Sequence, residues 1–534
     1  MPTTKKKRTS EPPKSNSQIL FSKGADLSRR EQRRKKKLIA QIIGFSLVAI
    51  EVVIAIVFVC MLFFLNMIPN KYMIMLIVIL ALISAYNLMS QFTRAHWLGK
   101  ALAVILSVAM VFGSLYVGKA NGVIGSATGV TTKTDSISLI VLKEDAAASL
   151  ADTAKYTFGY NSKNSADLMN KAIDSINKNV GTNVTTRTYD NSTAVVNALY
   201  NKDAQIIIFN ESARSTLEEQ FPDFHERTRI LETLNFETQI KTAPTVNKDT
   251  STDTFTIYIS GNDDYGSITA TGRSDVNIIA TFNPKTKQVL LVSTPRDYWV
   301  EVDSTTGQKG YEKLTHAGNY GVDSSITTLQ NLYGIDIDYY VKVNFTGAVG
   351  VIDALDGITI NSEVDFTNGQ DAAPVSYHFT VGDNECDGAK ALAFCRERQA
   401  FSDGDNQRGR NQMQAIKGMI AKATSPKILT NYNSVMDAVS GLIATSMPSD
   451  AISGLIKSQL SDGGSWNVLS YSVSGTGASR TGELFGLQGM SVVIPDNTTV
   501  NNAIEMMGKI RSGQVFDVTQ FLEDKALQTP TTAR

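Results

Sequence analysis

The sequence predicts an α/β protein that three N-terminal helices attach to a membrane, and three observations support this prediction. Residues 38–117 contain three long apolar stretches. Residues 136–240 and residues 254–425 each alternate apolar strands with helical patterns. We therefore expect a three-helix anchor, a small α/β accessory domain, and a second α/β domain with a mixed sheet and flanking helices. A chain of 534 residues is long enough for these parts.

The zero net charge of the chain hides a strong asymmetry. Residues 1–37 hold 13 of the 51 basic residues and 3 of the 51 acidic residues, so the rest of the chain carries 38 basic and 48 acidic side chains. Such a basic tail is typical of a segment beside an anionic membrane surface. Composition leaves a nucleic-acid-binding tail open as the alternative.

The apolar stretches have the length of membrane-spanning helices. A helix needs about 20 apolar residues to cross the hydrocarbon core, and a cleaved signal peptide has a much shorter apolar region. The stretches cover residues 38–65, 72–88 and 98–117. Within the first, Glu51 is expected to be protonated or bonded to a neighbouring helix, with Asn87 as a candidate partner.

The distribution of basic residues predicts the orientation. The basic tail is expected to stay in the cytoplasm, and the turn with Arg94 and Lys100 is expected to face the same side. Three crossings then place everything after about residue 117 outside the cell. If only two helices crossed the membrane, the part of the chain after about residue 117 would be cytoplasmic.

Composition also predicts the remaining boundaries. Residues 118–135 and 241–253 are rich in small and polar residues and are expected to be linkers around an accessory domain at residues 136–240. A second domain is expected at residues 254–425. Residues 426–534 are a C-terminal region without an assigned role, with two or three helices, a strand near 466–473 and a disordered end.

Regular elements are predicted in both domains. In the accessory domain, strands are expected at residues 137–142, 183–189 and 205–209, and helices at 165–177, 192–200 and 212–221. In the second domain, strands are expected at 254–260, 276–282, 288–293, 339–344 and 357–360, and helices at 323–333, 345–355, 389–394 and 406–423. The strands at 276–282 and 288–293 are expected to form a hairpin.

Three cysteines are too few for a disulfide framework. Cys60 lies in an apolar stretch. Cys386 and Cys395 could form one bridge in an exported domain, and two partly buried free thiols are the alternative.

Four polar clusters lie where apolar strands end or helices begin, which is where sites are usually built. They cover residues 261–266, 272–275, 293–297 and 395–412. Each one alone has the composition of a surface turn or an exposed ion pair. Together, the carboxylates and arginines suit a hard cation and an anion, because Mg²⁺ is usually held by one or two carboxylates plus substrate phosphates.

The clusters contain arginine and no lysine. Guanidinium groups match phosphate oxygens in pairs, whereas lysine is a point charge. Alternation along a strand predicts that Arg396 and Arg398 share a face, and helical spacing predicts the same for Arg408 and Gln412. The arginines of the four clusters are Arg273, Arg296, Arg396, Arg398, Arg408 and Arg410.

Other chemistries have little support in the sequence. The four histidines, at positions 96, 225, 316 and 378, lack a metal-ligand spacing. The sequence contains no Walker loop, no Gly-x-Ser-x-Gly motif and no kinase signature.

The motifs resemble those of the LytR-CpsA-Psr family. The resemblance rests on Gly-x-Asp at 261–263, Arg-Ser-Asp at 273–275, Thr-Pro-Arg-Asp at 294–297, Gly-Ala-Lys-Ala-Leu-Ala-Phe at 388–394, and Arg-x-Arg…Gly-Asp-Asn-x-Arg at 396–408. The three-span anchor and accessory domain are similar to the capsule-type CpsA branch. The similarity is expected to cover residues 38 to about 425.

The resemblance implies transfer of a glycopolymer, with capsular polysaccharide expected, from a polyprenyl diphosphate carrier to a peptidoglycan hydroxyl. The implied partners are the lipid-linked glycan, peptidoglycan and membrane lipid, with other capsule-assembly membrane proteins as candidates and no nucleic acid. The lipid chain is expected in an apolar groove that the sequence does not locate.

The resemblance also implies roles for individual residues. Asp263 and Asp275 would hold Mg²⁺ or Mn²⁺, and the adjacent Asp264 leaves the choice of carboxylate open. Asp405 would orient Arg398 or accept the proton of the incoming hydroxyl. The implied catalytic residues are Arg296, Arg398 and Asp405, and the implied diphosphate-binding residues are Arg273, Arg296, Arg396, Arg398, Arg408 and Gln412.

Three alternative functions remain open at this point. The same residues could hydrolyse the polyprenyl diphosphate, with water in place of the sugar hydroxyl. The basic tail is also compatible with a membrane-bound regulator or attenuator of capsule synthesis. A scaffold that only binds lipid-linked glycan is the third.

Overall fold

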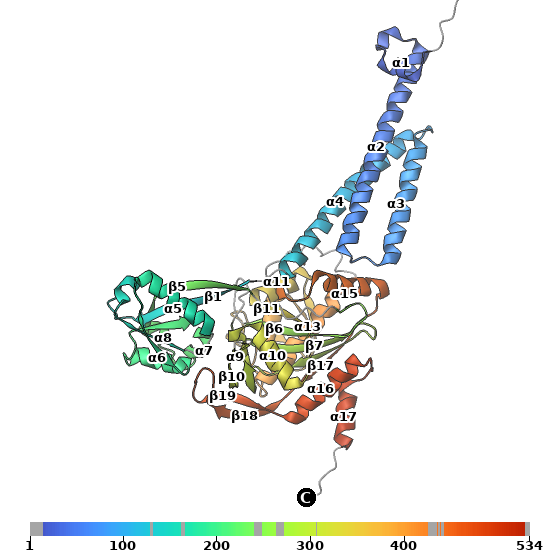
Figure 1. Cartoon of the computed structure of the whole chain (residues 1–534). Coiled ribbons are helices and arrows are strands. Elements are labelled where there is room, and N and C mark those ends of the chain that lie inside the picture. Colours follow the sequence, from blue (N-terminus) through green and yellow to red (C-terminus); the bar gives the residue numbers. More distant parts are fainter. Residues whose placement is uncertain are drawn as a thin grey trace, which may run out of the picture. The chain divides into compact units, whose positions relative to one another are not determined.

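The computed structural model describes residues 14–128, 132–161, 166–239, 248–262, 272–305, 307–425, 435, 438 and 443–528 (Figure 1). The predicted metal ligand Asp263 and its neighbour Asp264 lie outside the described residues, as do most of the predicted linker at 241–253 and the end of the chain after residue 528. The chain forms two compact units, Met1–Asn121 and Gly122–Arg534.

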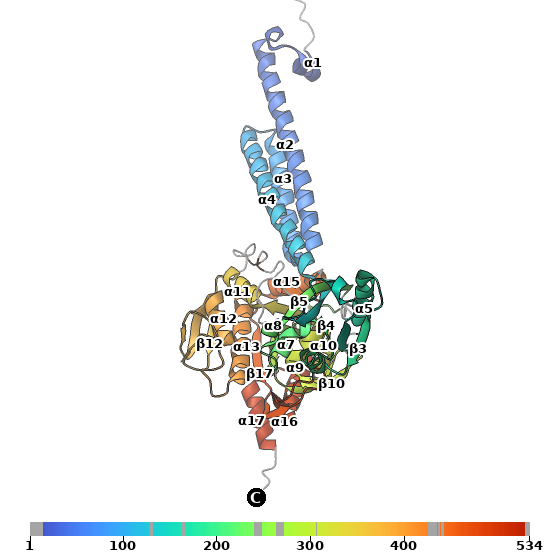
Figure 2. The same cartoon turned by 90° about the vertical axis from the view of Figure 1, so that its left-hand side faces the viewer.

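The first unit consists mainly of three long helices that run side by side (Figures 1 and 2). Its helices are α1 (Asn16–Phe21), α2 (Arg29–Leu65), α3 (Asn70–Ser90) and α4 (His96–Thr128). The last three are long and apolar enough to cross a membrane. Their outer faces carry exposed apolar side chains such as Ile56, Leu82 and Leu115. The predicted apolar helices are confirmed, and they indicate a membrane anchor.

Glu51 of α2 is fully buried among the three helices. Its carboxylate accepts a hydrogen bond of 2.9 Å from Asn87 Nδ2 and one of 3.0 Å from Ser84 Oγ, and both donors belong to α3. The expected bond to Asn87 is therefore present. A polar group in an apolar bundle needs such partners, and these two join α2 to α3.

The second unit begins with a five-stranded sheet in the order β3-β2-β4-β1-β5. Its strands are β1 (Thr132–Leu142), β2 (Thr157–Asn161), β3 (Thr185–Tyr189), β4 (Ile206–Asn210) and β5 (Thr228–Gln239). Its helices are α5 (Ala166–Val180), α6 (Ser192–Tyr200), α7 (Arg214–Glu218) and α8 (Phe224–Arg227), with 3₁₀ turns η2 (Leu150–Thr153) and η3 (Glu211–Ala213). The sequence predicted neither the short β2 nor the edge strand β5, whose many polar residues conceal its strand character.

A six-stranded mixed sheet, in the order β16-β11-β6-β7-β8-β17, forms the centre of the unit. Its strands are β6 (Phe255–Asn262), β7 (Val276–Asn283), β8 (Gln288–Ser293), β11 (Tyr339–Asn344), β16 (Ile443–Thr445) and β17 (Asn467–Ser472). The expected hairpin of β7 and β8 is present. The region after residue 425, to which the sequence assigned no role, supplies both edge strands.

Helices cover both faces of this sheet. On β7, Ile278 belongs to the same hydrophobic cluster as Met413 of α13, while the next residue, Ile279, belongs to a cluster with Leu329 of α10 and Met506 of α16. Successive side chains of a strand point to opposite faces, so a strand buried on both sides becomes almost continuously apolar. These helices are α10 (Val322–Tyr333), α13 (Asp405–Ala423) and α16 (Asn497–Arg511).

Smaller elements complete the unit. Strand pairs are formed by β9 (Trp299–Asp303) with β10 (Lys309–Lys313), β12 (Ile358–Ser362) with β15 (Gly382–Cys386), β13 (Phe366–Thr367) with β14 (His378–Phe379), and β18 (Gly475–Arg480) with β19 (Met490–Pro495). The remaining helices are α9 (Leu314–Ala317), η4 (Gly318–Tyr320), α11 (Phe345–Ala354), α12 (Gly388–Arg396), α15 (Ser449–Asp462) and α17 (Val518–Gln528).

Candidate active site

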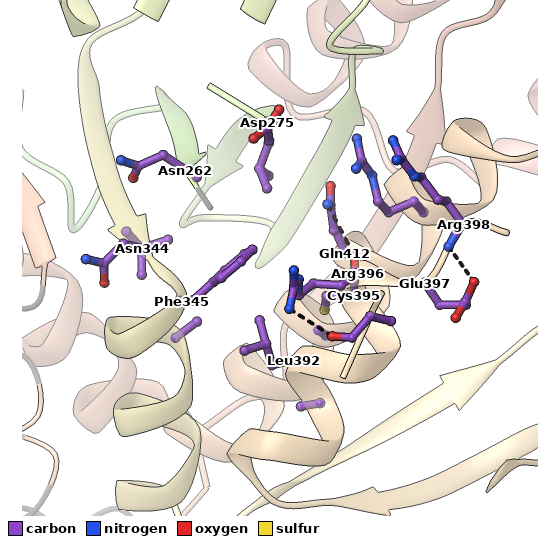
Figure 3. Close-up of a pocket in the computed structure, with 18 of the residues that line it drawn as sticks. Asn262, Asp275, Asn344, Phe345, Leu392, Cys395, Arg396, Glu397, Arg398 and Gln412 are labelled. Atoms are coloured by element: carbon purple, nitrogen blue, oxygen red, sulfur yellow. Dashed lines mark hydrogen bonds between the residues drawn. The ribbon is translucent and has the colours of Figure 1, made fainter. Parts of the chain in front are cut away.

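A cavity of about 440 Å³ opens where strands and helices of the central sheet meet. The parallel strands β6 and β11 end together there, in register at Asn262 and Asn344. Asn344 then caps α11 by accepting a hydrogen bond of 2.9 Å from the backbone N–H of Gly347. Figure 3 shows side chains from the sheet, α11, α12 and α13 around this space.

One part of the cavity wall is charged. The structure brings together here most of the site residues that the sequence predicted, although they are spread over some 140 positions of the chain. The predicted residues that line the cavity are Arg273, Asp275, Arg296, Arg396, Arg398, Arg408 and Gln412.

Another part of the wall is apolar. Its side chains come from α11, α12 and α13, which stand beside one another next to the sheet (Figure 3). The resemblance implied an apolar groove without locating it, and this apolar wall is a candidate for it. The wall forms only when the three helices pack together, so no local pattern in the sequence marks it. Its apolar lining includes Phe345, Ala348, Ile352, Leu392, Ile416 and Met419.

Asp275 and Arg296 form a buried ion pair at the charged wall. Arg296 Nη1 donates to Asp275 Oδ1 at 2.6 Å. Burial by itself would raise the pKa of Asp275, but the charge and hydrogen bond of Arg296, together with Arg273 and Arg408, lower it below its usual range. Asp275 Oδ2 has no hydrogen-bond partner within the described part of the chain.

Arg408 and Asp405 lie on the first turn of α13. Arg408 Nη2 is 2.5 Å from Asp405 Oδ1, and the same oxygen is 3.9 Å from Arg296 Nε. Burial lowers the pKa of Arg408; Asp405 opposes this effect, while nearby Arg296 and Arg398 add to it. The positive charges of these arginines therefore lie close together, and a bound anion would stabilise the charged guanidinium groups.

The prediction that Arg396 and Arg398 share a strand face is wrong. Arg396 is the last residue of α12, and Arg398 lies in the turn that follows it. The helix extends this far because Asp387 caps its start and Ala391, Ala393 and Phe394 bury its apolar face. Both arginines still line the cavity.

Glu397 holds this turn in place. Its buried carboxylate accepts backbone hydrogen bonds from Arg398 and Ala400, both at 2.9 Å, and from Gly369 at 2.5 Å. Arg396 donates to Ala372 O at 2.9 Å. The loop around Ala372 and the turn that carries Arg398 are therefore fastened together.

Arg410 is the one arginine of the four clusters that does not line the cavity. It forms ion pairs of 3.0 Å with Glu363 and 2.8 Å with Asp403. It lies two residues after Arg408 on α13, and a step of two residues rotates the side chain by about 200° around the helix axis, to the side away from the cavity.

Cys386 and Cys395 are free thiols in the structure. Burial raises the pKa of Cys386 to about 11 and that of Cys395 to about 12. Both groups are therefore protonated at neutral pH, and Cys395 contributes a neutral surface to the cavity wall.

Some cavity residues were missed by the sequence analysis. Asn344 and Phe345 lie at the end of a strand that the sequence predicted, so their position could have been inferred. Glu219 belongs to the accessory domain, and no signal in the sequence links it to this site.

The family model that matches this chain is that of the LytR_cpsA_psr family, over residues 225–507. The chain belongs to the LytR-CpsA-Psr family. The match begins at residue 225, not at the expected residue 38, so it leaves out the three apolar helices and most of the accessory domain. It ends beyond residue 425, where the resemblance was expected to stop. It therefore includes the edge strands β16 and β17 of the central sheet.

Two named relatives of the family match part of the chain. The polyisoprenyl-teichoic acid–peptidoglycan teichoic acid transferase TagU of Bacillus anthracis is 35% identical over 180 residues, which cover 34% of this chain. TagU of Enterococcus faecalis is 36% identical over the same length. In both cases the chain spans 56% of the relative's length.

Solved structures of the family also match. The crystal structure of TagV from B. subtilis is 25% identical with a TM-score of 0.41, and the match covers 49% of this chain and 98% of TagV. The structure titled TagT bound to LIIa-WTA is 25% identical with a TM-score of 0.40, and the match covers 51% of this chain and 97% of TagT.

Proposed function

We propose that this protein transfers a glycopolymer, capsular polysaccharide or a related polymer, from a polyprenyl diphosphate to a hydroxyl group of peptidoglycan. The observation that carries the proposal is a single cavity with arginines on one wall and apolar side chains on another. A polyprenyl diphosphate has the matching anionic and apolar parts. Membership of the LytR-CpsA-Psr family and the names of the TagU relatives support the same reaction class.

In the proposed reaction, the acceptor hydroxyl oxygen attacks the phosphorus atom that carries the glycan. The bond from this phosphorus to the bridging oxygen breaks, and polyprenyl phosphate leaves with that oxygen. The acceptor hydroxyl loses its proton to a base. Negative charge shifts onto the leaving phosphate, so Arg296, Arg398 and Arg408 can act by stabilising it.

The resemblance implied that Asp405 orients Arg398, but its ion pairs are with Arg408 and Arg296, and we propose that it positions these two arginines. One of its oxygens contacts both Arg408 and Arg296, at 2.5 Å and 3.9 Å. This arrangement fixes the guanidinium groups before the donor binds, which lowers the reorganisation needed during the reaction. The second oxygen remains a candidate acceptor for the hydroxyl proton.

Magnesium is proposed as the cofactor. Asp275 fits this role because it lines the cavity and its Oδ2 has no hydrogen-bond partner within the described residues. Asp263, outside the described residues, would be the second carboxylate. A bound Mg²⁺ would neutralise charge on the diphosphate.

The proposed location of this chemistry is the outer face of the cell membrane. The basic tail before α2 and the charges of the turn between α3 and α4 favour a cytoplasmic N-terminus with three crossings. External protease should then digest a C-terminal tag on intact protoplasts. Digestion only after lysis would contradict this orientation.

The decisive experiment is a reconstituted reaction. The full-length protein in lipid vesicles would be given a polyprenyl-diphosphate glycan, Mg²⁺ and peptidoglycan fragments, and the products would be separated by mass. Glycan phosphate attached to the fragments supports transfer. Free glycan phosphate alone would show hydrolysis, and an unchanged donor would support a binding scaffold.

A further inference from the structure

Glu219 of the accessory domain reaches the charged wall of the cavity. It is the residue that follows α7, it lines the cavity, and its carboxylate forms an ion pair with Arg273 Nη1. The side chains are 41% and 20% exposed, respectively, so the pair lies at the mouth of the cavity where solvent still reaches it.

The segments that carry the two partners of this ion pair both form hydrogen bonds to the segment of α9 and η4. From one side, Thr216 of α7 accepts a buried hydrogen bond of 2.7 Å from Asn319 Nδ2. From the other side, the backbone N–H of Gly272 donates to Gly318 O at 3.0 Å. A Cβ atom on Gly318 would lie 2.3 Å from Gly272 O, so glycine is required for this close approach.

The accessory domain is held in this place by a shared hydrophobic core. Leu217 of α7 belongs to the same cluster of buried side chains as Ala317 of the second domain and Phe485 of the C-terminal region. Thr193 donates to Phe485 O from its backbone N–H at 3.1 Å and from its hydroxyl at 2.8 Å. The position of Glu219 beside Arg273 is therefore a property of the folded unit.

The ion pair conflicts with binding of an anion at Arg273. A phosphate oxygen on this guanidinium would lie close to the Glu219 carboxylate, and two negative charges at such a distance repel each other. The neighbouring arginines increase the attraction for the anion. The anion and the Glu219 carboxylate therefore compete for Arg273.

We propose that Glu219 is an internal competitor of the donor's diphosphate for Arg273, through which the accessory domain sets the affinity for the donor. This inference rests on the proposed function, because it takes the diphosphate as the ligand of the arginines. Donor binding breaks the Glu219–Arg273 pair, and the pair forms again when the product leaves. A partly exposed ion pair limits the effect to about two- to fivefold in affinity.

The test uses the full-length protein in detergent and farnesyl diphosphate as the probe, with binding measured by calorimetry in the presence of Mg²⁺. Glu219→Gln keeps the size of the side chain and removes its charge. We expect this variant to bind the probe about two- to fivefold more tightly than the wild type. The gain should disappear in the Arg273→Gln background, because the competition needs both side chains.

Glu218→Gln is the matched control. Glu218 is the preceding residue, carries the same charge, and pairs with Arg214 at 3.6 Å instead of lining the cavity. It should bind the probe as the wild type does. A similar gain in Glu218→Gln would indicate a general charge effect and would overturn the proposal.

The two proposals fail in different ways. If the wild type binds farnesyl diphosphate and Arg296→Ala does not, but Glu219→Gln binds equally or less tightly than the wild type, the competitor role is wrong and the proposed function stands. If the wild type and Arg296→Ala both fail to bind the probe, the proposed function fails, and the inference about Glu219 fails with it.

Discussion

Asp275 and Arg296 meet across the open end of a β-hairpin. Asp275 directly precedes β7 and Arg296 follows β8, and the antiparallel pairing of these strands brings the two ends together. The resulting ion pair of 2.6 Å is buried beside the cavity. The proposed anion site is therefore built on two strands that pair in the centre of the sheet.

Arg296→Ala is expected to lower the rate of glycan transfer by about 10²- to 10³-fold, because one preorganised donor to a developing charge contributes about that much. The rate would be measured in the reconstituted vesicle reaction. Arg410→Ala is the matched control, since Arg410 pairs with Glu363 and Asp403 away from the cavity. Equal losses in both variants would contradict a special role of Arg296.

Asp275→Asn is expected to reduce the free energy of unfolding by about 1–3 kcal/mol at neutral pH, because Arg296 loses a charged partner in a buried place. The lowered pKa of Asp275 sets the pH dependence. The native carboxylate contributes stability above its unfolded pKa of about 3.9, and this contribution is lost as the pH falls through the lower folded pKa.

The measurement for this prediction is chemical unfolding of the solubilised full chain at several pH values. The difference between wild type and Asp275→Asn should stay constant down to about pH 4 and shrink at lower pH. A difference that grows on acidification would show that the native carboxyl group is protonated more easily than assumed.

Ala348→Phe is expected to fill the apolar part of the cavity, because Ala348 lines it on α11. Binding of farnesyl diphosphate should weaken at least tenfold, about the effect of losing a contact worth 1.4 kcal/mol. Binding of inorganic pyrophosphate should stay the same, since it needs only the charged wall. Parallel weakening of both ligands, measured by calorimetry, would argue that the whole site is disturbed.

Glu397→Ala is expected to destabilise the fold by at least about 2 kcal/mol, because three backbone N–H groups lose a buried acceptor. It should also lower transfer by freeing the turn that carries Arg398. Glu397→Gln keeps one carbonyl acceptor and should restore part of the stability and part of the transfer rate. Thermal unfolding and the transfer rate would be compared, and a stable Glu397→Ala variant with full activity would refute this role.

Much of the site could be predicted from the sequence. Arginines without lysines, placed next to carboxylates at strand ends, indicated an anion and a cation before any geometry was known. The pattern failed at Arg396 and Arg398, where an alternating motif of two arginines fitted a strand but belongs to a helix end and a turn. Tertiary packing of Ala391 and Phe394 decided that conformation.

The sequence by itself determined the three apolar helices, the alternation of strands and helices, and the arginine-rich composition of the candidate site, because these depend on periodicity and residue type within short segments. Only the tertiary structure decided that α11, α12 and α13 enclose an apolar space, that β16 and β17 complete the sheet, and that Glu219 reaches Arg273. Each of these relationships joins segments far apart in the chain, and their contacts follow from how the surfaces fit together rather than from any local pattern.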